Sequence, residues 1–357
     1  MEVQLKHPDN LSEQELSLWR SLTHQPQFSS PFLHPAYTQS IAKFRRQIEV
    51  AVFTEDSQPT GYLPFERHDG KVGRPLGIKL ADFQGCISQE PIQFDQPGLL
   101  KRLNLSQIHF DHLVHAEIPT ESILSQSDSP YMDLSHGYQE YLTARRESGN
   151  RSLSQVLRKE RKMEREVGPI TFQWQDMDEH AMHSLFEWKS AQRQATNTAD
   201  ILEFEWVKNF LKHLHQTEQS GMNGALSTLR IHDRVVAVHF GMFTNNCLHY
   251  WFPTYDYEFH KYSPGLILLL RMAEQCAELG ISRLDLGKGN DSYKDSLASG
   301  AVSVAEACYD RSSTRRFIRR SLLHAKQWVK QSRFKSTLQK PKKLIRQWQN
   351  KSTMGAS

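Results

Sequence analysis

The chain has 357 residues, of which 38% are apolar and 24% charged, so it is long enough for two domains with hydrophobic cores, and global disorder is excluded. No apolar run approaches the roughly 18–20 residues that a bilayer span needs. The N-terminus has neither the basic nor the apolar region of a secretory signal. The four cysteines lie far apart with no CxxC pair, which favours reduced thiols over disulfides or a zinc site. We therefore expect a cytoplasmic protein without a bound metal.

The net charge of +4 is unevenly distributed along the chain. Residues 311–357 contain 14 Lys or Arg and no Asp or Glu, which leaves the rest with 30 basic and 40 acidic side chains, a net charge of −10. Apolar residues recur in this tail at helical spacing, at Ile318, Leu322, Ala325 and Val329. Such a helix can bind an anionic membrane surface or a partner complex, and either would place the protein at the inner membrane face. The alternative is that the helix packs back on the acidic body. Nucleic acid is the weaker alternative, because no binding module is recognisable.

The first 130 residues predict short helices, a hairpin and a connecting loop. Ser12 and Glu15 form the pattern of a capping box, and runs of β-forming residues flank polar turn residues. In chain order we expect a helix after Ser12, a helix over 34–44, strands at 48–55 and 60–67, a strand at 108–118 and a loop over 119–130.

The second half predicts helices, then an antiparallel meander, then a crossover helix. The helices are expected at 138–147, 152–166, 182–189 and 204–216, and the meander strands at 226–231, 234–243 and 247–255. Ser263 fits the N-cap of the next helix, Pro264 its first position and Gly280 its left-handed C-terminal stop. A helix of this length between two strands is typical of a parallel crossover. The order excludes a doubly wound nucleotide-binding fold.

The start of the 263–280 helix is a candidate anion site. Its free N–H groups and the positive end of its dipole face outward, and no acidic side chain follows before Glu274. Gly265 allows a ligand close to the backbone, and Lys261 lies just upstream. The alternative is that Ser-Pro-Gly simply begins a helix.

The segment RLDLGKGNDSYKD is a second candidate. We expect Asp285 at a strand end, Gly287 in a pliable loop, and Tyr293 and Lys294 projecting from that loop. Tyr and Lys can donate to a developing negative charge, and Asp can orient or deprotonate an amine. The alternative is an exposed turn with solvated charges.

Histidines and cysteines outside these segments give weaker signals. His239 interrupts an apolar strand and is either a core histidine or a base that faces a cleft. His109, His112 and His115 do not converge on one face of a strand, which argues against a metal site. Cys308 has no base nearby in the sequence and is best explained as a buried thiol.

The run YDYEFHKYSPGLILLL followed by LGISRLDLGKGNDSYK resembles the acyltransferase domain of CelD-like polysaccharide-biosynthesis proteins. These belong to the GNAT (acyl-CoA N-acyltransferase) superfamily and are related to the FemABX peptidyltransferases. VAVHFGM, RPLGIKLADFQG and HFDHL also match, so the resemblance extends from about Ser30 to Asp310.

The resemblance implies an α+β fold, with two tandem GNAT-like domains that each have a mixed sheet flanked by helices. We expect a degenerate GNAT-like domain over 1–137, the acyltransferase domain over 138–310 and the basic tail over 311–357. In this fold, splayed strands beside the crossover helix hold the acyl donor, and the helix start holds its pyrophosphate.

The resemblance also implies roles for individual residues. His239 and Asp285 are candidate bases or orienting groups, and Tyr293 and Lys294 are candidate donors. The donor site is assigned to Lys261, Ser263 and Gly265. The acceptor side is assigned to Asp82, Gln84, Tyr255 and Gly287.

The donor implied by the resemblance is acyl-CoA, with acetyl-CoA the simplest case. The acceptor implied is an amino sugar or a sugar-linked intermediate of surface-polysaccharide synthesis. The helix start HKYSPG differs from the Q/R-x-x-G-x-G/A pattern of many GNAT enzymes, and the FemABX relatives, which also lack that pattern, use aminoacyl-tRNA. An aminoacyl-tRNA-dependent transferase and a non-catalytic docking protein of a synthesis complex therefore remain alternatives.

Overall fold

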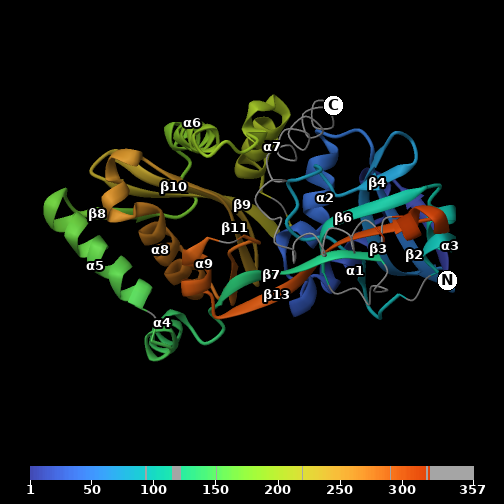
Figure 1. Ribbon diagram of the computed structural model, residues 1–357, viewed down its shortest axis with the longest axis horizontal. Coiled ribbons are helices and arrows are strands. Elements are labelled where there is room, and N and C mark those ends of the chain that lie inside the picture. Colours follow the sequence, from blue (N-terminus) through green and yellow to red (C-terminus); the bar gives the residue numbers. More distant parts are fainter. Residues whose placement is uncertain are drawn as a thin grey trace. The chain divides into compact units, whose positions relative to one another are not determined.

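The computed structural model describes residues 1–92, 95–114, 122–149, 151–218, 220–289, 291–318 and 321 (Figure 1). The chain divides into two compact units that interleave along the sequence. Unit 1 comprises the described parts of Met1–Phe28, Tyr37–Ser127 and Ser303–Ser357, and unit 2 comprises those of Ser29–Ala36 and Asp128–Val302. The domain boundaries expected at 137/138 and 310/311 stay a prediction.

Unit 1 contains a mixed sheet with helices. Its elements are β1 (Glu2–Lys6), α1 (Glu13–Leu22), α2 (Pro35–Ala42), β2 (Ile48–Glu55), β3 (Gln58–His68), β4 (Val72–Arg74), β5 (Ile87–Ser88), α3 (Gln96–Arg102), β6 (Gln107–Leu113) and most of β13 (Gly300–Asp310). The strand order is β1-β2-β3-β4-β6-β13, with β5 on β3. All neighbours along this path are antiparallel except β4 and β6, which are parallel.

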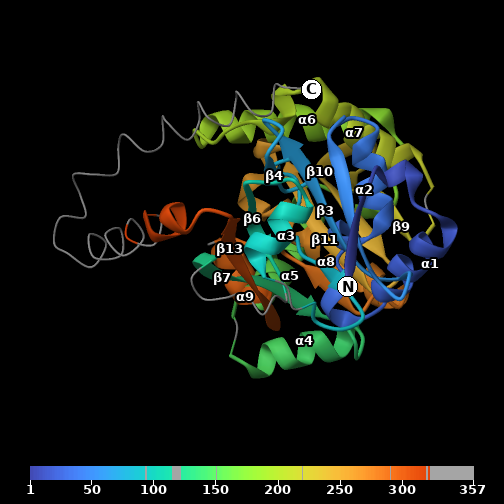
Figure 2. The ribbon, with the colours of Figure 1, turned by 90° about the vertical axis from the view of Figure 1, so that its right-hand side faces the viewer.

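The predicted hairpin of unit 1 is confirmed. β2 and β3 pair antiparallel, and the turn between them contains Asp56 and Ser57, both with positive φ. On one side of the sheet, Trp19 of α1 stacks on Tyr62 of β3. Leu99, Leu100 and Leu103 of α3 pack into an apolar cluster with β3 and β6 (Figure 2). The sheet is therefore covered by helices, as the fold class requires.

Unit 2 repeats this arrangement. Its elements are the end of β7 (Ile123–Asp133), α4 (Tyr138–Glu147), α5 (Arg151–Glu166), β8 (Ile170–Gln173), α6 (Glu179–Ala195), α7 (Glu205–Gln216), β9 (Met222–Ile231), β10 (Arg234–Thr244), β11 (Cys247–Tyr255), the 3-10 helix η6 (Tyr257–Tyr262), α8 (Pro264–Glu278), β12 (Arg283–Asp285) and α9 (Ser292–Leu297). The strand order is β7-β12-β11-β10-β9-β8, antiparallel throughout except for the parallel pair β11 and β12.

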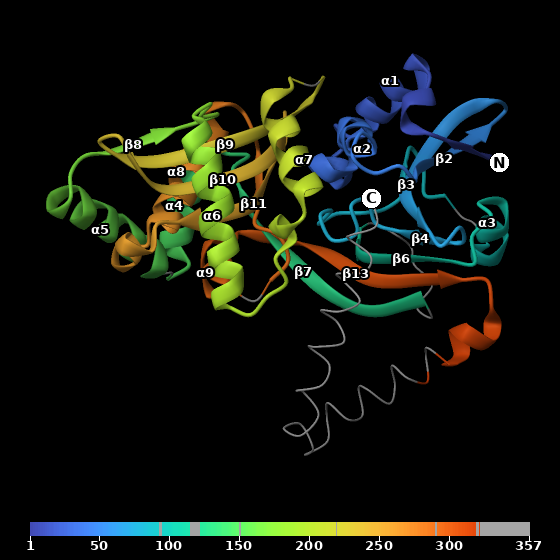
Figure 3. The same cartoon turned by 90° about the horizontal axis from the view of Figure 1, so that it is seen from above.

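The meander and the crossover helix of unit 2 are confirmed. α8 leads from β11 to the parallel strand β12, and it ends before Gly280, which has φ 76°. α6 and α7 lie over one face of β9, β10 and β11 (Figure 3). α8 packs on the other face, where its apolar side chains join Leu229, Leu248 and Tyr250 in one core.

One predicted element is wrong. The loop expected over 119–130 is largely strand, because β7 spans Ile123–Asp133, although 119–121 lie outside the described residues. The serines, Asp128 and Pro130 are typical of a loop, but backbone pairing of Tyr131, Met132 and Asp133 with β12 makes the end of this segment a strand. Tertiary pairing overrides local propensity here.

Candidate active site

The first feature of the site is an open strand edge in unit 2. β11 and β12 pair only through three residues each, and the last pair is His249 with Asp285. β12 ends there, whereas β11 continues to Tyr255. Beyond His249, no described strand pairs with the edge of β11 that faced β12. This edge therefore presents backbone N–H and C=O groups that a ligand can use.

A β-bulge lies at the start of the open edge. Phe240 pairs with Phe252 and Met242 with His249, so two residues of β11 oppose Gly241 alone. A Cβ at position 241 would clash with the carbonyl of His249 and with the His239 ring, which explains the glycine. The N–H of Trp251, in the bulge, donates to Nε2 of His239 at 3.0 Å.

His239 is fully buried beneath this bulge. Its ring stacks on Tyr250 with centroids 4.4 Å apart. Because Nε2 accepts a hydrogen bond, the neutral ring carries its proton on Nδ1. Burial, followed by the charges of His249 and Lys189, lowers the pKa of His239 well below its usual range. These contacts are those of a core histidine that supports the bulge, and its role as a base stays a prediction.

Lys189 of α6 reaches the open edge, although no motif in the sequence distinguishes it. Its Nζ donates to the carbonyl oxygen of Pro253 on β11 at 2.7 Å and to Oε1 of Gln192 at 3.0 Å. The side chain is half-buried overall, but protein atoms surround the amine. Burial and the nearby charge of Arg193 lower the pKa of Lys189 to about 7. Only the tertiary fold encloses this amine, so no sequence pattern could have identified it.

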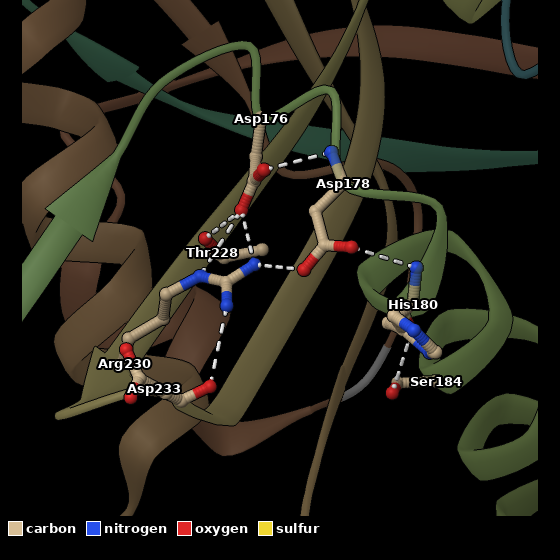
Figure 4. Close-up of polar contacts among 7 residues, drawn as sticks. All are labelled: Asp176, Asp178, His180, Ser184, Thr228, Arg230 and Asp233. Carbon is tan, nitrogen blue, oxygen red and sulfur yellow. Dashed lines mark hydrogen bonds and ion pairs between the residues drawn. The ribbon is translucent and has the colours of Figure 1, made fainter.

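A polar network fixes the start of α6 (Figure 4). Asp178 caps the helix by accepting the N–H of His180 at 2.9 Å. Arg230 of β9 donates to Asp178 at 2.6 Å and to Asp176 at 2.9 Å. Asp176 is buried and also accepts the hydroxyl of Thr228. The helix that carries Lys189 is therefore anchored to β9.

The start of α8 brings the predicted donor-site residues together. Ser263 is in the left-handed conformation (φ 56°, ψ 52°), and its hydroxyl does not cap the helix, contrary to the expected side-chain N-cap. Instead, Oγ of Ser263 accepts from Nζ of Lys159 of α5 at 2.8 Å. A Cβ at Gly265 would lie 3.3 Å from the Tyr255 ring. Lys261 precedes the helix and lies 3.8 Å from Glu166. Two lysines and an uncapped helix start are suited to a phosphate.

The 285–294 segment is more tightly held than expected. Asp285 is fully buried, lies 3.0 Å from Nε of Arg283, and accepts the thiol of Cys247 at 3.1 Å. Tyr293 and Lys294 belong to α9 and do not project from the loop as expected. Nζ of Lys294 folds back and donates to the carbonyl of Gly287 at 3.0 Å, while Gly287 has a positive φ of 71°. Burial raises the pKa of the Tyr293 phenol.

The two acceptor-side residues Asp82 and Gln84 belong to unit 1. The amide of Gln84 donates to the carbonyl of Ala81 at 2.9 Å and to Asp111, and its oxygen accepts the N–H of Asp111. Asp82 lies 4.0 Å from Nε2 of His112. The amide of Gln84 thus links the segment between β4 and β5 to β6, and the acceptor role of both residues stays a prediction.

The described residues contain no group of three or more His, Cys, Asp or Glu that could hold a metal ion. His109 and His112 have different neighbours, Cys308 and Asp111, and His115 lies outside the described residues. Cys308 is buried. Within the described part of the chain, no helix is long and apolar enough to cross a membrane.

Comparisons with known proteins agree with this fold. Residues 150–295 match the family described as an acetyltransferase (GNAT) domain, and this match supports an acyltransferase. A search of the curated proteins found no match. The crystal structure of FemX is similar at 10% identity, covering 89% of this chain and 99% of FemX with a TM-score of 0.56.

A second similar structure is the C-terminal DUF2156 domain of a protein from Agrobacterium fabrum named "Putative Lysylphosphatidylglycerol Synthetase". It is 10% identical, and the match covers 87% of this chain and 95% of that chain with a TM-score of 0.52. At this identity the likeness shows the fold alone. The expected class of mixed sheets flanked by helices, with a GNAT-like fold, is confirmed.

Proposed function

We propose that the chain is an N-acyltransferase that moves an acyl group from acyl-CoA to the amino group of an amino sugar or sugar-linked intermediate in surface-polysaccharide synthesis. The observation that carries the proposal is the open edge of β11 beside the uncapped start of α8. The acceptor class rests on the CelD-like sequence resemblance. The GNAT domain match over residues 150–295 supports the reaction class.

The donor fits the residues at this edge. The pyrophosphate of CoA would lie at the start of α8, near Gly265, Ser263 and Lys261, with Lys159 supplying a further positive charge. The amide-containing arm of CoA would run along the free backbone groups of β11, in the manner of an added strand. This course would bring the thioester toward the bulge at Trp251.

The reaction is direct attack of an amine on the thioester carbonyl. It needs an unprotonated amine, donors for the oxyanion and a proton for the leaving thiolate. The hydroxyl of Tyr293 is a candidate donor to the oxyanion, because the Trp251 N–H already bonds to His239 and Pro253 has no N–H. Lys294 would act by holding the Gly287 loop in position through its hydrogen bond to that carbonyl.

The donor class is tested by isothermal titration of the purified protein with acetyl-CoA, longer acyl-CoAs and free CoA. Micromolar binding of CoA species supports the proposal. If none binds, and if transfer from a charged tRNA is abolished by ribonuclease, the chain is an aminoacyl-tRNA-dependent transferase. If no donor of either class binds while loss of the tail abolishes function in cells, it is a docking protein.

We further propose that the basic tail holds the enzyme at an anionic membrane surface. Its described part includes Phe317 and Ile318, which are 71% and 52% exposed beside Arg315 and Arg316. The residues from Leu322 onward lie outside the described part of the chain. Sedimentation with phosphatidylglycerol vesicles should carry down the full chain, and removal of residues 311–357 or high salt should release it. Equal recovery with neutral phosphatidylcholine vesicles would contradict an electrostatic anchor.

A further inference from the structure

The register of β10 and β11 places the Lys189 amine at the open strand edge. The N–H of Asp256 bonds to the carbonyl of Val236. In an antiparallel pair every second residue bonds to the neighbouring strand, so Thr254 and Phe252 are the next residues that bond to β10. Pro253 falls between bonded positions, opposite His239, and has no N–H to donate. Its carbonyl therefore points away from β10, toward the edge of β11 that is open beyond the end of β12. Nζ of Lys189, 2.7 Å from that carbonyl, lies on the same side.

The amine is arranged to accept a proton. A neutral lysine amine has two N–H groups and one lone pair, and Lys189 donates to two acceptors, Pro253 and Gln192. The lone pair is then left for a third partner. Besides burial, the charges of Arg193 and Lys294 lower the pKa of Lys189, whereas the charge of Asp291 raises this pKa. His239 of β10 is also close to Lys189, and its own pKa lies well below the usual range, so its ring is neutral.

Other groups near the edge are already engaged. Nε2 of His239 accepts the Trp251 N–H, and Asp285 is in a buried ion pair with Arg283. Lys294 donates to two carbonyls, those of Gly287 and Lys288, and lies 3.7 Å from Asp291. Among these groups, Lys189 alone combines an amine whose pKa is lowered to about 7 with a position at the open edge.

We propose that Lys189 is the general base of the acyl transfer, and this inference rests on the proposed function. The acceptor arrives as an ammonium and gives one proton to the lone pair of Lys189. The freed amine forms the C–N bond with the thioester carbonyl carbon. The C–S bond breaks, the thiolate leaves with its electron pair, and the second proton of the nitrogen passes to that thiolate as the amide forms. Lys189 then returns its proton to water.

The protonation state of Lys189 can be measured without any activity. The lysines of the full chain are reductively methylated with ¹³C-formaldehyde, and the dimethyl-lysine signals are followed by NMR as the pH changes. We expect one signal with a midpoint near pH 7, absent from the Lys189→Arg variant. Titration of every lysine above about pH 9, near the ordinary lysine value, would overturn the proposal.

The pH dependence of kcat/KM gives the second test. The rate should rise with pH through about 7, because only the neutral amine accepts a proton. Lys189→Met should reduce kcat/KM by about 100-fold or more, the range typical of general-base loss. Lys212→Met, on the neighbouring helix α7, is the matched control and should leave the profile unchanged. Circular dichroism confirms that each variant folds.

Two neighbouring charges should move the profile in opposite directions. Arg193→Gln removes a positive charge, raises the pKa of Lys189 and shifts the rise to higher pH, whereas Asp291→Asn shifts it to lower pH. A merely structural Lys189 would leave the midpoint where it is in both variants. If both variants are active but their kcat/KM midpoints do not shift, the base role of Lys189 is overturned and the proposed function stands. A low NMR midpoint without transfer from any acyl donor overturns the proposed function, and the base role with it.

Discussion

The two units share one order of strand directions but differ where the parallel pair occurs. In each, three antiparallel pairings precede a parallel one, and an antiparallel strand follows. In unit 1, β4 ends at Arg74, one residue after its last pair with β6. In unit 2, β11 runs from its last pair at His249 to Tyr255. Among the described strands, the first strand of the parallel pair therefore continues well past its partner in unit 2 but not in unit 1.

The crossover helices of the two units, α3 and α8, also differ in length and in how their first turns are capped. In unit 1, α3 has 7 residues, and Asp95 caps it by accepting the N–H of Gly98 at 2.9 Å. In unit 2, α8 has 15 residues and no side-chain cap, and Lys159 lies at its first turn. A carboxylate occupies in unit 1 the place that an anionic ligand would take in unit 2. The comparison favours unit 2 over unit 1 as the place of the proposed donor site.

The largest expected effect concerns a feature that the units have in common, a buried Arg–carboxylate pair. Arg45 and Glu66 form one in unit 1, and Arg283 and Asp285 form the other in unit 2. Asp285→Ala should lower the free energy of unfolding by about 3–5 kcal/mol, because it removes the carboxylate that balances the largely buried charge of Arg283, and Glu66→Ala should cost a similar amount. Urea denaturation measures both. Asp285→Ala protein with wild-type stability and slow turnover would instead support the base role expected from the sequence.

The second prediction tests the difference between the helix starts. Gly265→Leu places a side chain against Tyr255 where the donor phosphate is expected, and should weaken donor binding about 10- to 100-fold, the loss of a charge-assisted contact of about 1.5–3 kcal/mol. Gly98→Leu is the matched variant in unit 1, where the new Cβ would meet Asp95 at 2.8 Å. Isothermal titration should show unchanged affinity for that variant. Equal losses in both would mean that unit 1 also binds the donor.

Local signals account for the parts of the fold that the sequence predicted. The meander turns, the Pro264 start and the Gly280 stop of the crossover helix each depend on a few neighbouring residues, and the structure contains all of them. β7 was missed because its strand character comes from pairing with β12, which lies about 150 residues further along the chain. Pairing at that separation leaves no mark on local composition.

The sequence predicted which residue types belong to the candidate site better than it predicted their burial and contacts. Lys261, Ser263 and Gly265 do meet at the start of α8. Asp285 was expected as an available carboxylate, but Arg283 and Cys247 engage it in the core. Lys189 was overlooked because its contact with Pro253 and the burial that lowers its pKa both depend on the tertiary fold.

The smallest expected effect compares one capped helix from each unit, α1 of unit 1 and α6 of unit 2. Ser12 and Glu15 cap α1 of unit 1 through a capping box, and Asp178 caps α6 of unit 2. Ser12→Ala and Asp178→Ala should each cost about 1 kcal/mol of stability, the usual value of an N-cap. The difference lies in activity, because α6 carries Lys189 and α1 carries no residue of the proposed site. Asp178→Ala should therefore also lower kcat, whereas Ser12→Ala should not.

Arg230→Met separates capping from anchoring at α6. It leaves the Asp178 cap to the His180 N–H intact but removes the link between the helix and β9. If anchoring positions Lys189, this variant should lower kcat as Asp178→Ala does, and the midpoint of the pH profile should change with it. If Arg230→Met alters stability alone, the position of Lys189 depends on its own contacts with Pro253 and Gln192 rather than on the start of the helix. The starts of α1 and α6 would then be structural alone, and the functional difference between the units would be confined to the crossover helix and the strand edge.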